Sequence, residues 1–566
     1  MDTLLALYYP DLPNNDYLAI ARKPEGYFVG IHAEGEVYPQ TYHPFWLAGE
    51  QKLQPLPFRR RDREVLPHYN TENVGYWKAP QFDRHLYYGY PDFTKDVFAA
   101  LEGLATLSTE QQQQLARAHA EHAMNLLNNQ FGTSDPAMRF KLDEAQRERL
   151  DAQQLSSYLI HINEAAKHYG ALPARWPTPV GDASTKYQHQ IITAYLSLLQ
   201  YATPTDAAAI VRQYFGGPVA TETRTARAEG YDAHLLFCSR LLLESCPQNA
   251  ILITEGDNDT YPLLYLQLVE NFRPDILVVN RHLLHLPRYV EVLRAGQQIG
   301  GSLQLSQDMA SIQAWESQQF LPGPRQTLIR PQAVEKVLNG LTRLPVSATE
   351  PVARLPFGAI QLSSKTDGPL FRPETPLFHS GDLVMLDLIA SNFNQRPIAV
   401  AVTINEDYFA YSNSWQQIGL VYNLGDEKPA YHIDLNGTIA WSALLSAPKR
   451  FDYIGEQSRF YLSQLEYLLL DVGYYLDRIN ETTTAIDLVD RYIAHAQSDQ
   501  IFNKHHYSRI LHLMHQLGYD PNLVSAYVGM TRESLLTVPL AERPPYYQER
   551  LRYLQHYLLE GEFPHR

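Results

Sequence analysis

The sequence predicts a chain of several domains that combines α+β and α/β architecture. Its 566 residues exceed what one ordinary hydrophobic core holds, and 45% hydrophobic with 19% charged residues is a globular composition. The hydrophobic period changes along the chain, from the alternation typical of strands to helical spacing and back. We expect four regions: a small β-rich N-terminal unit over residues 1–92, a helical bundle or solenoid-like region over 93–247, an α/β domain over 248–450 and a C-terminal helical region over 451–566.

The two N-terminal regions show this change of period most clearly. Strand-like runs at 17–21 and 27–31 flank Lys23-Pro24-Glu25-Gly26, which has the composition of a hairpin turn. Helical spacing begins near residue 93, and Ser108-Thr109-Glu110 is typical of a helix N-terminus. That helix is expected to end at about residue 132. Further strands are expected at 45–48 and 52–56, and further helices near 143–169, 185–201, 205–215 and 228–246.

The central region alternates strands with helices. Apolar runs at Ala250–Thr254 and Asp275–Val279 flank a helix predicted from Pro262 to Asn271, and this βαβ pattern favours a parallel pair of strands. Later strands are expected at 383–388, 398–404 and 419–423, and helical spacing returns over about 456–562.

Composition excludes several classes of function. The net charge of −15 argues against a nucleic-acid partner. The short basic run over residues 59–64 indicates a solvated loop, with an anion-binding or membrane-surface patch as the alternative. Cys238 and Cys246 stand eight residues apart on one predicted helix, about 12 Å, which is too far for a disulfide. We expect two buried thiols and no cysteine-based zinc site.

The sequence also bears on membranes and compartment. No apolar run approaches about 18 residues, so no transmembrane helix is expected. The N-terminus lacks the basic start of a secretory signal. These features predict a soluble, cytoplasmic protein, or one at the periplasmic face if the N-terminus is incomplete.

An acidic turn follows the first strand of the βαβ unit. Glu255, Asp257 and Asp259 lie where α/β folds place ligands, beyond the carboxyl end of a parallel strand, and Asn258 and Tyr261 lie among them. These carboxylates are suited to binding a cation or sugar hydroxyls. A structural interpretation is stronger: Gly256 permits a tight turn, and Asp259 or Thr260 caps a helix whose first turn contains Pro262.

Two further groups of polar residues complete the candidate ligand site. Asn280 and Arg281 end the second strand and face the same crevice, but His282 and His285 lack a fixed third ligand, so we expect no metal and no cofactor. Asp387 lies inside an apolar run and needs a partner if buried, and Arg396 is the predicted one. The candidate ligand-binding residues are Glu255, Asp257, Asn258, Asp259, Tyr261, Asn280, Arg281, Asp387, Asn392 and Arg396.

The order of several segments resembles one family. These segments are Tyr231-Asp232-Ala233, Leu243 to Pro247, Asn249 to Leu252, Gly256 to Leu263, Asp382 to Asn392, Arg396-Pro397-Ile398 and Gln417 to Tyr422. Over about residues 228–425 the chain is similar to the soluble C-terminal region of a mainly Bacteroidetes family of multi-pass membrane proteins. That family is of unknown function and related to protein O-mannosyltransferases. Leu264, where an aromatic residue is expected, and Phe393-Asn394-Gln395, in place of a Trp/Lys-containing stretch, depart from its pattern.

The resemblance implies an α/β region with flanking helices and assigns no catalytic residue, because it attributes glycosyl transfer to a membrane half that this chain lacks. The resulting hypothesis is a soluble, non-catalytic interaction or glycan-binding protein, with a protein or glycan partner or docking onto a membrane glycosylation system. The alternative is a carbohydrate-active transferase or hydrolase that uses Asp257 and Asp259 in the crevice at the strand ends.

Overall fold

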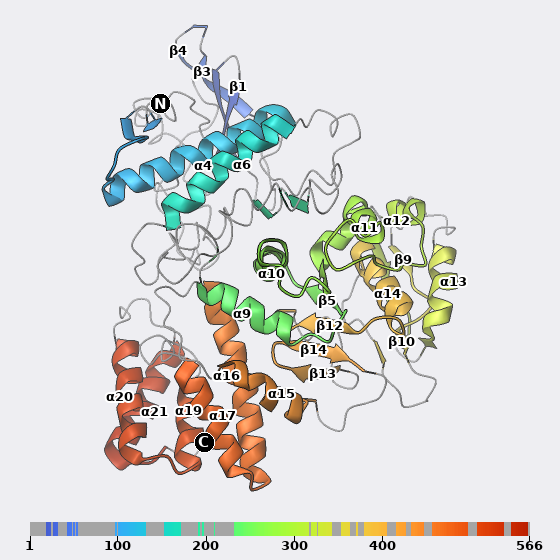
Figure 1. Cartoon of the computed structure of the whole chain (residues 1–566). Helices are drawn as coiled ribbons and strands as arrows, with labels where there is room; N and C mark the ends of the chain where they lie inside the picture. Colours follow the sequence, from blue (N-terminus) through green and yellow to red (C-terminus); the bar gives the residue numbers. More distant parts are fainter. Residues whose placement is uncertain are drawn as a thin grey trace. The chain divides into compact units, whose positions relative to one another are not determined.

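The computed structural model of the chain describes residues 18–23, 26–31, 42–47, 49–50, 52–54, 97–98, 100–131, 152–170, 191–192, 195–196, 209, 231, 233–315, 319–324, 327–341, 352–362, 370–371, 378–404, 415–425, 432–445, 456–495, 507–536 and 545–563. Helices and strands are mixed, as the sequence predicts (Figure 1), and two of the described sheets contain both parallel and antiparallel strands. The chain divides into two compact units, Met1–Pro136 with Asp143–Tyr187, and Ala137–Leu142 with Gln188–Arg566. The division into four regions stays a prediction.

The first unit contains an antiparallel sheet of four strands in sequential order. The predicted hairpin is confirmed, because Leu18 pairs with Ile31 and Lys23 with Gly26. The aromatic stretch over 59–92 lies outside the described residues. The strands are β1 (Leu18–Lys23), β2 (Gly26–Ile31), β3 (Tyr42–Leu47) and β4 (Lys52–Leu53).

Two long helices, α4 (Thr109–Phe131) and α6 (Ala152–Gly170), pack against each other in the same unit. The predicted start of α4 is confirmed. The Ser108 hydroxyl accepts from the Gln111 amide at 3.2 Å, and the Gln111 side chain accepts from the Ser108 amide at 2.9 Å. This reciprocal pair satisfies two of the donors that a helix N-terminus leaves unpaired. The helices expected at 185–201 and 205–215 fall mostly outside the described residues.

The second unit is organised around a five-stranded sheet with strand order β13-β14-β12-β5-β6. The predicted βαβ unit is confirmed, because β5 and β6 are parallel with Ile251 opposite Leu277 and Thr254 opposite Asn280. β12 pairs in parallel with the other side of β5, whereas β14 and β13 run antiparallel. The elements are β5 (Ile251–Thr254), α10 (Asp257–Glu270), β6 (Leu277–Asn280), β12 (Ile398–Ala401), β13 (Trp415–Ile418) and β14 (Val421–Leu424).

The strand order defines the edge of the sheet where a ligand is expected. From β5 the chain moves to β6 on one side, and it later returns to β12 on the other side of β5. The carboxyl ends of β5 and β12 are therefore neighbours at a point where the connections diverge, which is the usual ligand position in α/β sheets. All residues of β5, β6 and β12 are buried, so these strands form a rigid base for the loops that follow them.

A long insertion connects β6 to β12. It contains η3 (Arg281–His285), α11 (Pro287–Arg294), α12 (Met309–Trp315), β7 (Gln319–Leu321), β8 (Leu328–Ile329), α13 (Pro331–Leu341), β9 (Val352–Arg354), β10 (Ala359–Gln361), β11 (Leu370–Phe371) and α14 (Ser380–Asn392). The strand predicted at 383–388 is wrong, because these residues lie inside α14. Nearly every side of α14 is buried, so it lacks the polar face that would reveal a helical period.

Helix α10 also differs from its prediction. It begins at Asp257 rather than Pro262, so Pro262 lies in the second turn. Pro262 is the sixth residue of the helix, so it lacks the amide that would otherwise donate to the carbonyl of Asn258, and α10 has one backbone hydrogen bond fewer in its second turn. Asp257 and Asp259 therefore belong to the first turn of the helix, whereas Glu255 precedes it.

The remaining helices flank the sheet and extend to the C-terminus. α9 (Ala233–Glu244) packs on α10 and on α16 (Glu456–Arg478). From α16 onward each described helix packs on its neighbours in the chain. The others are α15 (Leu435–Ser442), η5 (Ala443–Leu445), α17 (Thr482–His495), α19 (Tyr507–Gln516), α20 (Pro521–Leu536) and α21 (Pro545–Glu560). Among the described helices, none combines the length and the apolarity needed to cross a membrane.

Candidate functional site

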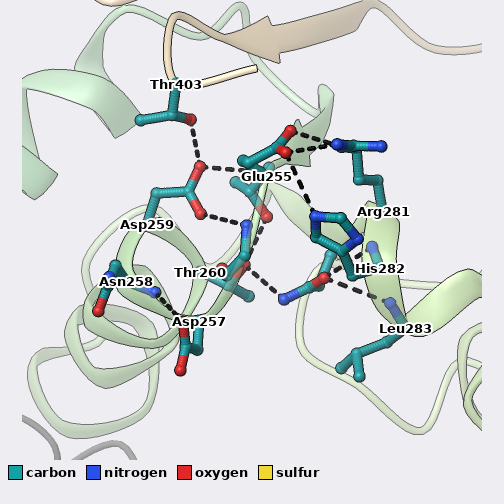
Figure 2. A network of polar contacts seen from close by, with 12 residues as sticks. Glu255, Asp257, Asn258, Asp259, Thr260, Arg281, His282, Leu283 and Thr403 are labelled. Carbon is teal, nitrogen blue, oxygen red and sulfur yellow. Dashed lines mark hydrogen bonds and ion pairs between the residues drawn. The ribbon is translucent and has the colours of Figure 1, made fainter. Parts of the chain in front are cut away.

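Asp259 is the structural centre of the acidic turn (Figure 2). Its carboxylate accepts from the amides of Glu255 and Gly256, both at 2.8 Å, and Thr403 donates a hydroxyl hydrogen bond to the same group. The side chain is only 2% exposed. Burial raises the pKa of Asp259 to about 6, while the hydrogen bonds from Thr403, Gly256 and Glu255 act in the opposite direction. Asp259 thus fixes the turn from inside the helix, whereas Gly256 occupies the cap position.

Thr403 is a site residue that the sequence analysis missed. It follows β12, and its bond to Asp259 joins the carboxyl ends of β12 and β5 at the point where the connections diverge. The sequence signal that could have indicated Thr403 was its place near the end of the strand predicted over residues 398–404. This bond connects the two strand ends, so the buried Asp259 carboxylate is hydrogen-bonded to groups of the protein itself.

Asn280 also has a structural role. Its side-chain oxygen accepts from the amides of His282 at 2.9 Å and Leu283 at 3.3 Å, so it caps η3. Its side-chain nitrogen donates to the Thr260 hydroxyl at 3.1 Å, and Thr260 in turn lies 2.6 Å from the Thr254 hydroxyl. This network ties the start of α10 to the ends of β5 and β6.

Glu255, Arg281 and His282 form a charged cluster at the same edge (Figure 2). Arg281 binds the Glu255 carboxylate through two nitrogens, with Nε at 2.5 Å, and His282 Nε2 lies 3.2 Å from Oε1. Burial alone would raise the pKa of Glu255, but the hydrogen bonds and charges of His282 and Arg281 lower it to about 2. The side chains of Glu255, Arg281 and His282 are 30%, 18% and 57% exposed, so the cluster is accessible from solvent.

The other residues of the turn divide between solvent and core. Asp257 and Asn258 are exposed on the first turn of α10, where the Asp257 carboxylate accepts from the Asn258 amide at 2.9 Å. Tyr261, the remaining candidate in this segment, is 5% exposed and packs into the core. Asp257 and Asn258 are therefore the fully exposed polar members of the turn, and Glu255 is partly exposed.

Asp387 and Asn392 hold a distant loop. Asp387 is 1% exposed and accepts from the Ser306 amide and hydroxyl, the Gln307 amide and the Ser391 hydroxyl, at 3.1, 2.7, 3.0 and 2.9 Å. Asn392 accepts from the Gln304 amide at 3.3 Å and donates to its carbonyl at 2.8 Å. Both residues thereby anchor the loop over 304–307, and the expected Asp387–Arg396 pair is not formed.

Arg396 instead binds backbone carbonyls at the opposite end of the sheet. Its guanidinium donates to Asn249 at 2.8 Å, to Ala250 at 3.2 Å and to Asp275 at 3.4 Å. These residues precede β5 and β6, whereas the acidic turn follows β5. Arg396 therefore lies at the amino edge of the parallel strands and cannot share a crevice with Glu255 and Asp259. The sequence placed it there wrongly because its partners are backbone groups that no residue pattern marks.

Substitution of Arg396 with lysine is expected to lower the free energy of unfolding of the sheet by about 1–2 kcal/mol, because one ammonium group cannot reach the separate carbonyls that the planar guanidinium binds. Native-state hydrogen exchange of the β5 and β6 amides measures the effect. Arg288→Lys is the matched control, since Arg288 makes a surface pair with Glu291 on α11. Equal effects of the two substitutions would contradict this role for Arg396.

Metal-binding chemistry finds no support in the described residues. No group of three or more His, Cys, Asp and Glu side chains in that part of the chain is arranged to hold a metal ion. Cys238 and Cys246 are buried thiols outside any disulfide, as the sequence predicts, and burial raises the pKa of the Cys246 thiol well above its usual range. These thiols are packing residues.

Comparison with known proteins gives one finding, and it covers the segment that carries most of this site. No curated protein and no solved structure matches the chain. Residues 238–330, which include β5, α10, β6 and the Glu255–Arg281–His282 cluster, match the family model of TMEM260-associated domain 2.

Proposed function

We propose that this protein is a non-catalytic interaction protein that binds a glycan at the carboxyl edge of β12, β5 and β6. The observation that carries this proposal is the division of labour among the polar residues there. Asp259 and Asn280 are buried in structural hydrogen bonds, whereas Asp257, Asn258 and His282 expose polar groups to solvent. An edge with a fixed interior and a polar exterior supports recognition rather than bond cleavage.

The chemistry of the exposed groups suits hydroxyl-rich ligands. Glu255 is ionised at neutral pH because its pKa is about 2, and a carboxylate accepts about four hydrogen bonds. Arg281 and His282 provide three contacts to it. The cluster therefore gathers hydrogen-bond donors and acceptors in one place, and such a set suits the hydroxyls of a sugar ring.

The family comparison supports a role in a glycosylation system, because the family that the chain resembles over about residues 228–425 is related to protein O-mannosyltransferases. The matched model describes a domain associated with TMEM260. We propose that the chain docks onto a membrane glycosylation system, with a protein partner as the alternative to a glycan, and that it acts in the cytoplasm. Fractionation of cells by compartment tests this location, and recovery in the periplasm would contradict it.

Glycan-array binding with matched variants tests the proposal. His282→Ala and the double substitution Asp257→Ala/Asn258→Ala are expected to weaken binding roughly tenfold or more with only a small fall in melting temperature, because these side chains are exposed. The control is Asp520→Ala/Asn522→Ala, an exposed pair of the same composition at the start of α20. Unchanged binding in the site variants, or no glycan bound by the wild type, would contradict the proposal.

The raised pKa of Asp259 supports a second candidate, a carbohydrate-active transferase or hydrolase in which this residue is the acid. Its burial and its hydrogen bonds to Glu255, Gly256 and Thr403 weigh against this role. Assays with activated aryl glycosides separate the two functions. Turnover that Asp259→Asn abolishes and Asp257→Asn reduces would favour the enzyme over the binding protein.

A further inference from the structure

Four histidines line the contact between α4 and α6, whose paired packing is seen in Figure 1. His119 and His122 come from α4, and His161 and His168 come from α6. The ring centroids are 4.2 Å apart for His122 and His161 and 5.6 Å apart for His119 and His168, and the latter rings are stacked. The ring of Phe98 covers His119 at 4.6 Å. These side chains form a compact cluster that we call the histidine seam.

The central contact of the seam depends on protonation. Nδ1 of His119 lies 3.0 Å from Nδ1 of His161. Two facing imidazole nitrogens form a hydrogen bond only when one carries a proton and the other accepts it. If both rings become imidazolium, both nitrogens are donors and the two positive charges repel. The observed geometry therefore requires at least one neutral ring.

The surroundings of the seam favour the neutral rings. His119 is 3% exposed. Burial, followed by the neighbouring charges of His161, His168 and His122, lowers its pKa from 6.5 to about 3. Burial and His122 lower the pKa of His161 to about 4, and Glu164 is the nearby acid that opposes this shift.

The rest of the seam follows the same pattern. Burial lowers the pKa of His122, and the Gln112 side chain lies 2.8 Å from Nδ1 of His168. Alanines at 116, 118, 120 and 123 on α4, and at 165 and 166 on α6, are buried along the helices. Small side chains let helix backbones approach closely and leave little room for water around a charged ring.

We propose that the histidine seam is a proton-sensitive contact that holds α4 against α6 at neutral pH and releases it on acidification. A metal ion is the other common partner of clustered histidines, but in the described part of the chain no three such side chains are arranged to hold one. The contact is independent of the glycan site and acts within the first unit.

The direction of the effect follows from proton linkage. The folded pKa values of His119 and His161 lie below the ordinary 6.5, so the open state binds more protons in acid. The contact is fully formed above about pH 6.5. It weakens as the pH falls from 6.5 toward the folded pKa values, which are about 4 for His161 and about 3 for His119. Between pH 7.5 and 5.0 each of these two histidines increases the opening equilibrium about 30-fold.

Hydrogen exchange of the 566-residue chain tests the proposal. After correction for the intrinsic pH dependence of exchange, peptides from α4 and α6 are expected to lose protection by about 30-fold or more between pH 7.5 and pH 5.0. Peptides from α13 serve as an internal control. The double variant His119→Asn/His161→Asn keeps polar atoms near the Nδ1 positions without a titrating ring, so its α4 and α6 should lose far less protection.

The control variant His556→Asn removes an exposed histidine of α21 and should behave as the wild type. If the double variant does not fold, the single variant His119→Asn should lose about 30-fold less protection than the wild type. Three results would overturn the proposal: equal protection at both pH values, full acid sensitivity in the variant that folds, or opening at pH 7.5 caused by EDTA alone. The last result would assign the histidines to a metal ion.

Discussion

Replacement of Asp387 with alanine is expected to lower the free energy of opening of α14 and the 304–307 loop by about 3–5 kcal/mol. The buried carboxylate accepts from two backbone amides and two hydroxyls. Alanine leaves all four donors without this acceptor and opens a cavity where water is scarce. Leaving a buried donor unsatisfied costs about 1–3 kcal/mol, and losses within one network add only in part.

Native-state hydrogen exchange is the suitable measurement, because a chain with several cores need not unfold in a single step. The amides of Ser306 and Gln307 should lose protection together with those of α14. Ser391→Ala is the graded control, since it removes one donor, leaves the carboxylate in place and is expected to cost about 1 kcal/mol or less. A similar cost for both substitutions would show that the loop is held by other contacts.

The parts of the fold that were predicted correctly are those that local pattern determines. The β1–β2 hairpin follows from alternation around a Pro-containing turn, and β5 and β6 follow from apolar runs that flank a helix. Helix α14 was predicted as a strand because it is buried on almost every side. A continuous apolar run looks alike in a buried strand and a buried helix. The distinguishing residue in the sequence was Asp382, three positions after His379, and in the structure its carboxylate accepts from the His379 amide at 2.7 Å and caps the helix.

The candidate site shows a different limit. The sequence indicated the acidic turn and its position at a strand end, and the structure places Glu255, Asp259, Asn280 and Arg281 at that edge. The sequence could not indicate the hydrogen-bond partner of each side chain. Thr403 is 144 residues from Asp259, and Ser306 is 81 residues from Asp387. Such pairs arise from topology, which local spacing does not encode.

Asp259→Ala and Asp257→Ala are expected to have very different effects, although both remove a carboxylate from the first turn of α10. Asp259→Ala deprives the amides of Glu255 and Gly256 and the Thr403 hydroxyl of their acceptor, and should destabilise the β5–α10–β6 region by about 3 kcal/mol. Asp257→Ala removes an exposed side chain and its favourable interaction with the helix dipole, and should cost about 0.3–1 kcal/mol. Hydrogen exchange of β5 and β6 compares the two.

Thr403→Ala separates the two parts of the Asp259 network. It removes the contact to β12 and leaves both backbone contacts, so a cost of about 1 kcal/mol is expected. A larger loss for Thr403→Ala than for Asp259→Ala would mean that the link between strand ends dominates over the turn.

Equal, small losses of stability for Asp257→Ala and Asp259→Ala would remove the structural reason for burying Asp259. The turn would then have to be explained by a ligand, because a buried carboxylate that stabilises nothing in the free protein is retained for what it binds.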